Sequence, residues 1–255
     1  MSLVMGWDEW ASHDAVGLAE RVRQGDVTPA ELAHQAAAGI AKVNPTLSAV
    51  VEVFEDLLTD PTRDGMNPDG PFAGVPYLMK DLGPTFKGRL QEMGSRLMRG
   101  NRPTADSYLA GRIKQAGLNV IGRTTTPEFG VCSSAENPAV YVTRNPWDLG
   151  RTPGGSSSGA GAGTAAGYAP LHLGTDIGGS IRLPAGWCGL VGLKPSHGRV
   201  PIKPAYAGRV AGPLTRTVAD AALMLAALAR RFTRRPALVF LGVCLVLLVL
   251  DGINP

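Results

Sequence analysis

The segment that decides the fold is RTPGGSSSGAGAGTAAGYAPLHLGTDIGGSIRLPAG, residues 151–186. It is rich in glycine, serine and alanine, and it contains two Gly-Gly-Ser triplets, at 154–156 and 178–180. A flexible linker of this composition would have no need of Asp176, Ile177, Arg182 or Pro184, nor of the strand-like apolar runs around them. The segment is therefore interpreted as part of a folded site.

A nucleotide-binding loop is a poor match to this segment. A Walker loop ends in Gly-Lys-Ser/Thr, which is absent here. Residues 161–166, GAGTAA, match a relaxed dinucleotide fingerprint, but serine and glycine precede them where a hydrophobic strand is required. Neither form of phosphate binding is expected.

A nucleophile elbow is the second alternative. Residues 155–159, GSSSG, match GxSxG and would make Ser157 the nucleophile, with Asp176, His172 and His197 available as partners. The preceding residues NPWDLGRTP do not form the strand that an elbow requires. The elbow therefore remains a weaker alternative.

Composition bounds the class of protein. The 255 residues are 44% hydrophobic and 18% charged, which suits one globular domain, or one and a half. The net charge of +4 comes partly from four arginines within residues 230–235, so a nucleic-acid partner is not expected. Three cysteines (Cys132, Cys188 and Cys244) without a CxxC pattern indicate neither a disulfide framework nor a zinc site. With no signal peptide visible, the sequence predicts a cytoplasmic protein.

The hydrophobic pattern predicts alternating helices and strands. Two helices are expected within residues 14–42, the first ending at Gly25 and the second starting from a capping box at Thr28. Residues 74–81 read as a buried strand whose end carries Lys80, and residues 118–122 as another strand after a helix at 106–117. Further helices are expected at 159–170 and 217–229. This order predicts helices layered on a largely parallel sheet.

The end of the chain changes character. Residues 236–250 carry no charge and directly follow the arginine cluster. As a helix they would reach roughly 22 Å, short of the ~30 Å hydrocarbon core of a bilayer. Three interpretations stay open: a buried helix or strand, a marginal membrane anchor, and a tail that is not native to the fold.

Several blocks together resemble the amidase signature family. They are GGSSSG at 154–159, GTDIGGSIRLPA at 174–185 and GLVGLKP at 189–195, with GVPYLMKD at 74–81 and NPWD at 145–148 upstream. The resemblance covers roughly residues 14–228 and implies an α/β fold with a mixed β-sheet between helices. Family members are usually much longer, so the fold is expected to be incomplete at the C-terminus. The predicted division is an N-terminal portion of an amidase domain at 1–228 and a basic and apolar tail at 229–255.

The resemblance also implies the roles of individual residues. Ser180, in the second Gly-Gly-Ser, corresponds to the family's nucleophile, Ser156 to its bridging serine and Lys80 to its base. A cis peptide is implied between Gly155 and Ser156. The implied oxyanion hole consists of the backbone N–H groups of Ile177, Gly178, Gly179 and Ser180. Asp176 and Arg182 are expected to pair or to support this loop.

This chemistry explains why such residues are needed. A serine hydroxyl is a weak nucleophile until a base takes its proton. A free lysine, with a pKa of about 10.4, is protonated at neutral pH, so Lys80 can act as that base only if burial lowers its pKa. Adjacent glycines let backbone N–H groups converge on one oxyanion without side chains in the way.

The sequence thus predicts an amidase that cleaves carbon–nitrogen bonds, other than peptide bonds, of small linear or cyclic amides through an acyl-enzyme. The segments at 74–83 and 123–130 look more like the branch that contains 6-aminohexanoate-cyclic-dimer hydrolases than like tRNA-dependent amidotransferases. The expected partner is a small amide substrate, and no cofactor or metal is expected. A homodimer is compatible with the sequence. Membrane contact is expected only through the tail. The alternative is a catalytically inactive, truncated fragment that associates with membranes through residues 236–250.

Overall fold

A computed structural model describes residues 3–205 and 207–229 of the chain. The helices are α1 (Trp7–Ser12), α2 (Ala15–Gln24), α3 (Pro29–Leu47), α4 (Glu55–Thr59), α5 (Tyr108–Gln115), α6 (Ser158–Ala165), α7 (Arg182–Cys188) and α8 (Val218–Leu228), with short 3₁₀ turns η1 (Arg96–Met98) and η2 (Glu128–Gly130). The strands are β1 (Val50–Val53), β2 (Pro76–Lys80), β3 (Asn119–Thr124), β4 (Glu136–Asn137), β5 (Tyr141–Val142), β6 (Leu171–Asp176), β7 (Val191–Gly192) and β8 (Val210–Thr215).

The strands form a mixed arrangement, as the resemblance implied. In the order β1-β3-β2, β2 runs parallel to β3 and β1 runs antiparallel to it. In the order β6-β8-β7 both pairs are antiparallel. The prediction of a largely parallel sheet is therefore wrong. A parallel pair needs a crossover connection, which α5 provides between β2 and β3, whereas β8 pairs with β6 in the antiparallel direction.

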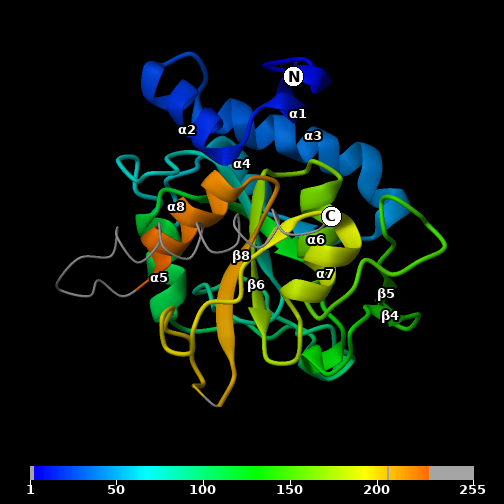
Figure 1. The fold of residues 1–255 in the computed structure, drawn as a ribbon. Helices are drawn as coiled ribbons and strands as arrows, with labels where there is room; N and C mark the ends of the chain where they lie inside the picture. Colours follow the sequence, from blue (N-terminus) through cyan, green and yellow to red (C-terminus); the bar gives the residue numbers. More distant parts are fainter. Residues whose placement is uncertain (1–2, 206, 230–255) are drawn as a thin grey trace, which may run out of the picture.

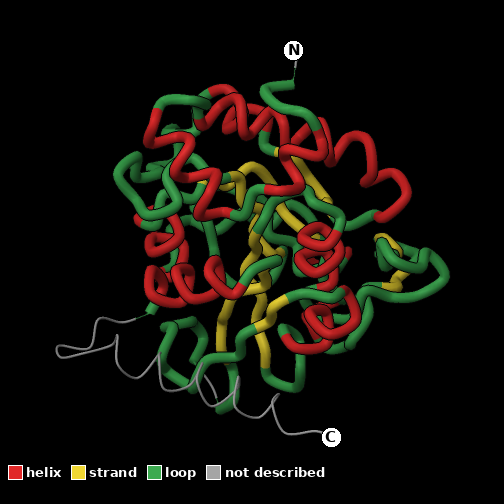
Figure 2. Tube along the Cα trace, turned by 45° about the horizontal axis from the view of Figure 1, so that its top comes forward, coloured by secondary structure: helices red, strands yellow, loops and turns green. Residues whose placement is uncertain are grey.

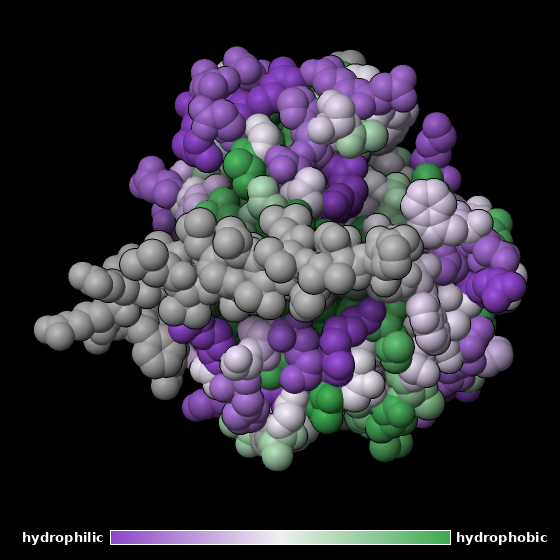
Figure 3. Space-filling model, viewed as in Figure 1, coloured by the Kyte–Doolittle hydropathy of each residue, from purple (hydrophilic) through white to green (hydrophobic). Residues whose placement is uncertain are grey.

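The helices lie on both sides of the strands (Figures 1 and 2). In Figure 1, α5 and α8 lie on one side and α6 and α7 on the other, while α1, α2 and α3 cover one end. The helical end presents mostly hydrophilic side chains on the face shown in Figure 3. The order of layers explains why β2 and β6 are buried along their whole length.

The predicted N-terminal helices are confirmed with their capping signals. The Gly25 backbone is left-handed, at φ +77°, and ends α2. Thr28 accepts a hydrogen bond from the Glu31 N–H while the Glu31 carboxylate accepts from the Thr28 N–H, so both orphan donors are satisfied. The helix α3 continues to Leu47, beyond the predicted end at residue 42. The first helix, α1, was not predicted.

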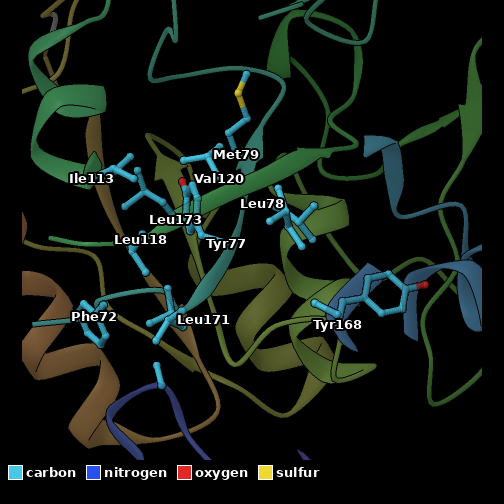
Figure 4. Packing of buried hydrophobic residues seen from close by; sticks show 14 of the residues in the cluster. Phe72, Tyr77, Leu78, Met79, Ile113, Leu118, Val120, Tyr168, Leu171 and Leu173 are labelled. Atoms are coloured by element: carbon cyan, nitrogen blue, oxygen red, sulfur yellow. The ribbon is translucent and has the colours of Figure 1, made fainter. Parts of the chain in front are cut away.

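The core joins strands that are far apart in the sequence. Figure 4 shows Tyr77 and Met79 of β2 close to Leu173 of β6, Val120 of β3 and Ile113 of α5. All of these side chains are buried. Burial of apolar surface at about 25 cal/mol per Å² fixes β2 against its neighbours. The consequence for the site is that the end of β2, at Lys80, is held rigidly.

The predicted small-residue helix forms as α6, and its glycines have a packing role. A Cβ atom on Gly159 would collide with the carbonyl oxygen of Ala49 and would lie 2.5 Å from the backbone N of Thr125. The amide of Gly159 donates to the Thr125 carbonyl at 3.1 Å. The start of α6 is thus pressed against the end of β3, which places residues 155–158 beside the end of β2.

Within residues 3–205 and 207–229, no helix has both the length and the apolar character needed to cross a bilayer. The apolar stretch at 236–250, Cys244 and nearly all of the predicted tail at 229–255 lie outside the described residues.

Candidate active site

Lys80 is the last residue of β2 and its side chain is completely buried (0% exposed). Its Nζ lies 2.8 Å from Ser156 Oγ, 3.1 Å from Ser157 Oγ and 3.0 Å from Thr175 Oγ1. Three hydroxyl groups therefore surround the amine. Because these three partners are neutral, none of them favours the charged form of the amine as strongly as a carboxylate would.

The environment makes Lys80 a much weaker base than a free lysine, and about half neutral at pH 7. Burial lowers the pKa of Lys80 from its ordinary 10.5 to about 7, because the ammonium form loses its hydration. The positive charge of Arg209 lowers this pKa further, and the negative charge of Asp176 opposes the shift. A lysine with such a pKa can accept a proton near neutral pH.

Ser156 and Ser157 differ in their access to solvent. Ser156 lies on the turn before α6, lines a pocket, and has its carbonyl held by Thr126 Oγ1 at 2.9 Å. Ser157 is fully buried, and its Oγ accepts hydrogen bonds from Lys80 Nζ and from the Thr175 N–H, the latter at 3.3 Å. The peptide bond between Gly155 and Ser156 is cis. Of the two serine hydroxyls that contact Lys80 here, Ser156 is the one on the pocket wall.

Ser180 lies on the loop between β6 and α7, which Asp176 organises. Asp176 Oδ1 accepts from the Gly179 N–H at 2.8 Å, and its Oδ2 accepts from the Ile181 N–H at 3.0 Å. The guanidinium of Arg182 donates to both oxygens, at 3.1 and 3.0 Å, so the expected Asp176–Arg182 pair is confirmed. Burial acts to raise the pKa of Asp176, but these donors outweigh it and hold the pKa below its ordinary value.

A pocket of about 350 Å³ brings the two serines of the Gly-Gly-Ser triplets together. Its wall consists of Leu82, Phe129, Gly130, Val131, Cys132, Ser133, Gly155, Ser156, Thr175, Asp176, Ile177, Gly178, Ser180, Leu183 and Arg209. Lys80 is not on this wall and lies behind Ser156. The order from the buried interior to the pocket is therefore Lys80, Ser156 and then the space beside Ser180.

The four residues expected to form an oxyanion hole are not equivalent. Ile177, Gly178 and Ser180 line the pocket. The Gly179 N–H instead donates to Asp176, at 2.8 Å, and its backbone adopts φ +120°, which glycine tolerates. In this conformation Gly179 shapes the loop, and its amide is already used.

The arrangement does not assemble a serine–histidine pair at Ser157. The Nδ1 of His172 lies 2.7 Å from Thr164 Oγ1, and burial lowers the pKa of His172 to about 3. His197 is exposed on a turn. Because Ser157 is buried and bonds to Lys80 and Thr175, the geometry gives no support to the nucleophile-elbow alternative.

The NPWD segment has a structural role that its sequence does not reveal. Asn145 Nδ2 donates to the Trp187 carbonyl at 3.0 Å, and Trp147 Nε1 donates to the Cys188 carbonyl at 2.9 Å. These bonds hold the C-terminal end of α7. The helix that follows Ser180 is thereby fixed from both ends, by Asp176 at its start and by this segment at its end.

Three residues near the site were not singled out from the sequence. Thr175 is the third partner of Lys80, and Arg209 lines the pocket. Gly130, at φ +71°, packs so closely that a Cβ there would lie 3.3 Å from Ser156 Oγ. Thr175 stands within the block GTDIGGS at 174–180, so its hydroxyl, next to the loop expected to carry the nucleophile, was a usable signal. Nothing in the sequence marks Gly130 or Arg209.

The part of the chain that the structure describes contains no group of three or more His, Cys, Asp or Glu side chains arranged to hold a metal ion.

Comparison with known proteins gives consistent matches. Residues 31–239 match the family described as Amidase. The 6-aminohexanoate-cyclic-dimer hydrolase of Paenarthrobacter ureafaciens is 42% identical over 196 residues, which are 76% of this chain and 38% of that protein. A glutamyl-tRNA(Gln) amidotransferase subunit of Thermus thermophilus is 40% identical over 213 residues, or 82% of this chain and 45% of the relative.

Solved structures match over most of the chain. A structure of 6-aminohexanoate cyclic dimer hydrolase aligns with a TM-score of 0.80 at 38% identity and covers 91% of this chain and 48% of that one. The peptide amidase from Stenotrophomonas maltophilia aligns with a TM-score of 0.77 at 34% identity, covering 88% and 49%. The chain thus spans less than half the length of these relatives.

Proposed function

The chain belongs to the amidase signature family, and from this premise we propose that it hydrolyses an amide bond with Ser180 as nucleophile, Ser156 as proton relay and Lys80 as base. The observation that carries the proposal is the contact of 2.8 Å between Lys80 Nζ, whose pKa is about 7, and the Oγ of Ser156 on the pocket wall. A buried neutral amine next to a pocket hydroxyl is what activation of a serine requires.

In the proposed reaction, Ser180 Oγ attacks the amide carbonyl carbon as its proton passes to Ser156 Oγ. Ser156 in turn gives its own proton to Lys80 Nζ. When the tetrahedral intermediate collapses, the C–N bond breaks and the departing amine takes a proton from Ser156, which is replenished from Lys80. Water then attacks the acyl-enzyme by the same relay and releases the carboxylic acid.

The negative charge on the substrate oxygen needs donors that are already in place. We propose the pocket-side backbone amides of Ile177, Gly178 and Ser180 for this role, with Gly179 included in the loop that presents them. The bonds from Gly179 and Ile181 to Asp176 support this assignment, because they fix the loop before substrate binds. Loss of one such donor typically costs about 3 kcal/mol of barrier.

The substrates we propose are small linear or cyclic amides other than peptides. The pocket volume of about 350 Å³ and its mixture of apolar and polar lining suit a small molecule. The similarity to 6-aminohexanoate-cyclic-dimer hydrolases supports this class. A cytoplasmic location is part of the same proposal, and the unpaired state of Cys132 and Cys188 is compatible with it.

Labelling with a fluorophosphonate serine probe tests the function. We expect the wild-type chain to be labelled, Ser180→Ala to lose labelling, and Ser157→Ala to retain most of it. Labelling that survives in Ser180→Ala and disappears in Ser157→Ala would favour the elbow chemistry and refute the relay.

A further inference from the structure

Asp81 directly follows Lys80 and faces the other side of the sheet. The Asp81 N–H donates to the Thr124 carbonyl at 3.1 Å, so the contact of this segment with β3 continues one residue past Lys80. Successive side chains of a strand point to opposite faces, and Asp81 lines a separate cavity of about 200 Å³. The next residue, Leu82, lines the pocket of the two serines. The backbone of Asp81 therefore joins the proposed base to the pocket wall.

A buried arginine holds the Asp81 carboxylate in place. Arg123 of β3 is only 4% exposed, and its Nη1 donates to Asp81 Oδ1 at 3.0 Å. Its Nη2 donates to Glu92 at 2.7 Å and its Nε to Glu52 at 2.9 Å. The Asp81 carboxylate also accepts from the N–H groups of Glu92 and Gly94, at 2.9 and 3.1 Å. The three carboxylates and their shared guanidinium form one unit, the Arg123 cluster.

The Arg123 cluster also reaches the pocket wall beside Ser156. Met93 lies between the two amides that Asp81 binds, and its carbonyl accepts from the Phe129 N–H at 2.9 Å. Phe129 and Gly130 line the pocket, and a Cβ atom on Gly130 would lie 3.3 Å from Ser156 Oγ. The cluster is therefore connected to the segment that carries the proposed base and to the wall beside the proposed relay.

We propose that Arg123 is a positioning residue for amide hydrolysis, which keeps Lys80 in contact with Ser156 and shielded from water by holding Asp81 and Glu92. This inference rests on the proposed amidase function. A guanidinium suits the task because its five N–H donors form a rigid planar fork, whereas an ammonium group is a point charge. A buried ion cluster adds little net stability over apolar packing, so the value of this one lies in the geometry that it enforces.

A loosened cluster should be visible in the titration of Lys80. Water that reaches the amine stabilises its charged form and moves its pKa from about 7 back toward 10.5. The charges of Asp176 and Arg209, which also act on this pKa, stay in place when Arg123 is replaced. A rise of one pH unit would leave about one tenth of the lysine neutral at pH 7 instead of half, so labelling by the fluorophosphonate probe would slow about fivefold.

The test measures the pH midpoint of Lys80 by NMR titration of its isotopically labelled Nζ, assigned through Lys80→Met. The pH dependence of fluorophosphonate labelling is measured in the same variants. We expect Arg123→Met to raise both midpoints by about one pH unit or more, and Arg123→Lys to raise them by a smaller amount. Because Arg123→Lys keeps the positive charge, a shift in that variant reports the lost geometry and not the lost charge.

Arg89→Met is the matched control. Arg89 is also largely buried and donates to two carboxylates, Asp56 and Asp64, but it is not part of the described pocket wall. This variant should lower the free energy of unfolding and leave the Lys80 midpoint unchanged. An equal shift in Arg89→Met would show that any loss of stability moves the midpoint, and would overturn the role of Arg123.

The titration does not depend on turnover, so it separates failure of this inference from failure of the amidase function. An unchanged Lys80 midpoint in Arg123→Met would overturn the inference, and so would an unchanged midpoint in Arg123→Lys if the methionine variant does not fold. Loss of labelling in every protein, with a Lys80 midpoint that still depends on Arg123, would refute the amidase function and leave the hold of Arg123 on Lys80 standing.

Discussion

The burial of Lys80 makes the stability of the fold depend on pH in a defined window. The pKa of Lys80 is about 7 in the folded chain and near 10.5 in the unfolded chain. Between these values the unfolded chain binds one proton more than the folded chain, so the free energy of unfolding rises with pH. Below about pH 7 both states are protonated, and the penalty of burying the ammonium group is constant.

The size of the effect follows from the two pKa values. The slope approaches 1.36 kcal/mol per pH unit where the folded lysine is neutral and the unfolded one charged. At pH 7 only half of the folded molecules have lost the proton, so the gain from pH 7 to pH 9 is about 2 kcal/mol. This gain belongs to Lys80 alone, and Lys80→Met should lack it.

Urea unfolding at pH 7, 8 and 9 measures this difference. The free energy of unfolding of the wild type should rise by about 2 kcal/mol relative to that of Lys80→Met over this range. The variant also leaves three hydroxyls without their partner, at Ser156, Ser157 and Thr175, but this cost does not change with pH. If the two proteins moved in parallel between pH 7 and 9, Lys80 would have an ordinary pKa, and its role as base would have to be abandoned.

Three further predictions concern the neighbours of this lysine and the helix that supports it. Thr175→Val removes one acceptor of Lys80 and should slow fluorophosphonate labelling about fivefold; an unchanged rate would show that this hydroxyl does not position the base. Gly130→Ala forces a side chain onto a backbone at φ +71°, at a cost of about 1–2 kcal/mol, and presses on Ser156. The relative loss of labelling rate in Gly130→Ala should exceed its relative loss of free energy of unfolding. A larger loss of free energy than of labelling rate would argue against contact between Gly130 and the proposed relay. Gly159→Ala should lower the free energy of unfolding, measured by urea titration, by about 1–3 kcal/mol, because the new methyl group meets backbone atoms. Gly111→Ala, in a helix with open space around it, is the control and should be neutral or stabilising.

The sequence predicts those parts of the fold and of the site in which one local signal decides the outcome. The apolar run before Lys80 ends in a charge, and this was enough to predict a buried strand with a lysine at its end. The capping box at Thr28 likewise set the start of α3. In both cases neighbouring residues contain the whole cause.

The residues that the sequence did not reveal depend on contacts between segments that are far apart in the chain. Thr175 contacts Lys80 across 95 positions, and Arg209 reaches the pocket because Val210 pairs with Asp176. No local pattern encodes those distances. The expectation of a largely parallel sheet failed for the same reason, since the direction of β8 is set by its pairing with β6 and not by its own residues.

The position of Ser156 resolves a conflict between the two ends of the proposed relay. The base must be buried, because water would return the pKa of Lys80 toward 10.5, whereas the nucleophile must reach a substrate that arrives through water. No single side chain satisfies both conditions, and Lys80 is absent from the wall on which Ser180 lies. Ser156 contacts the buried amine and also lines the pocket, so a proton can cross the boundary while water does not. On this view the close packing of Gly130 matters because it helps to hold the hydroxyl of Ser156 at that boundary.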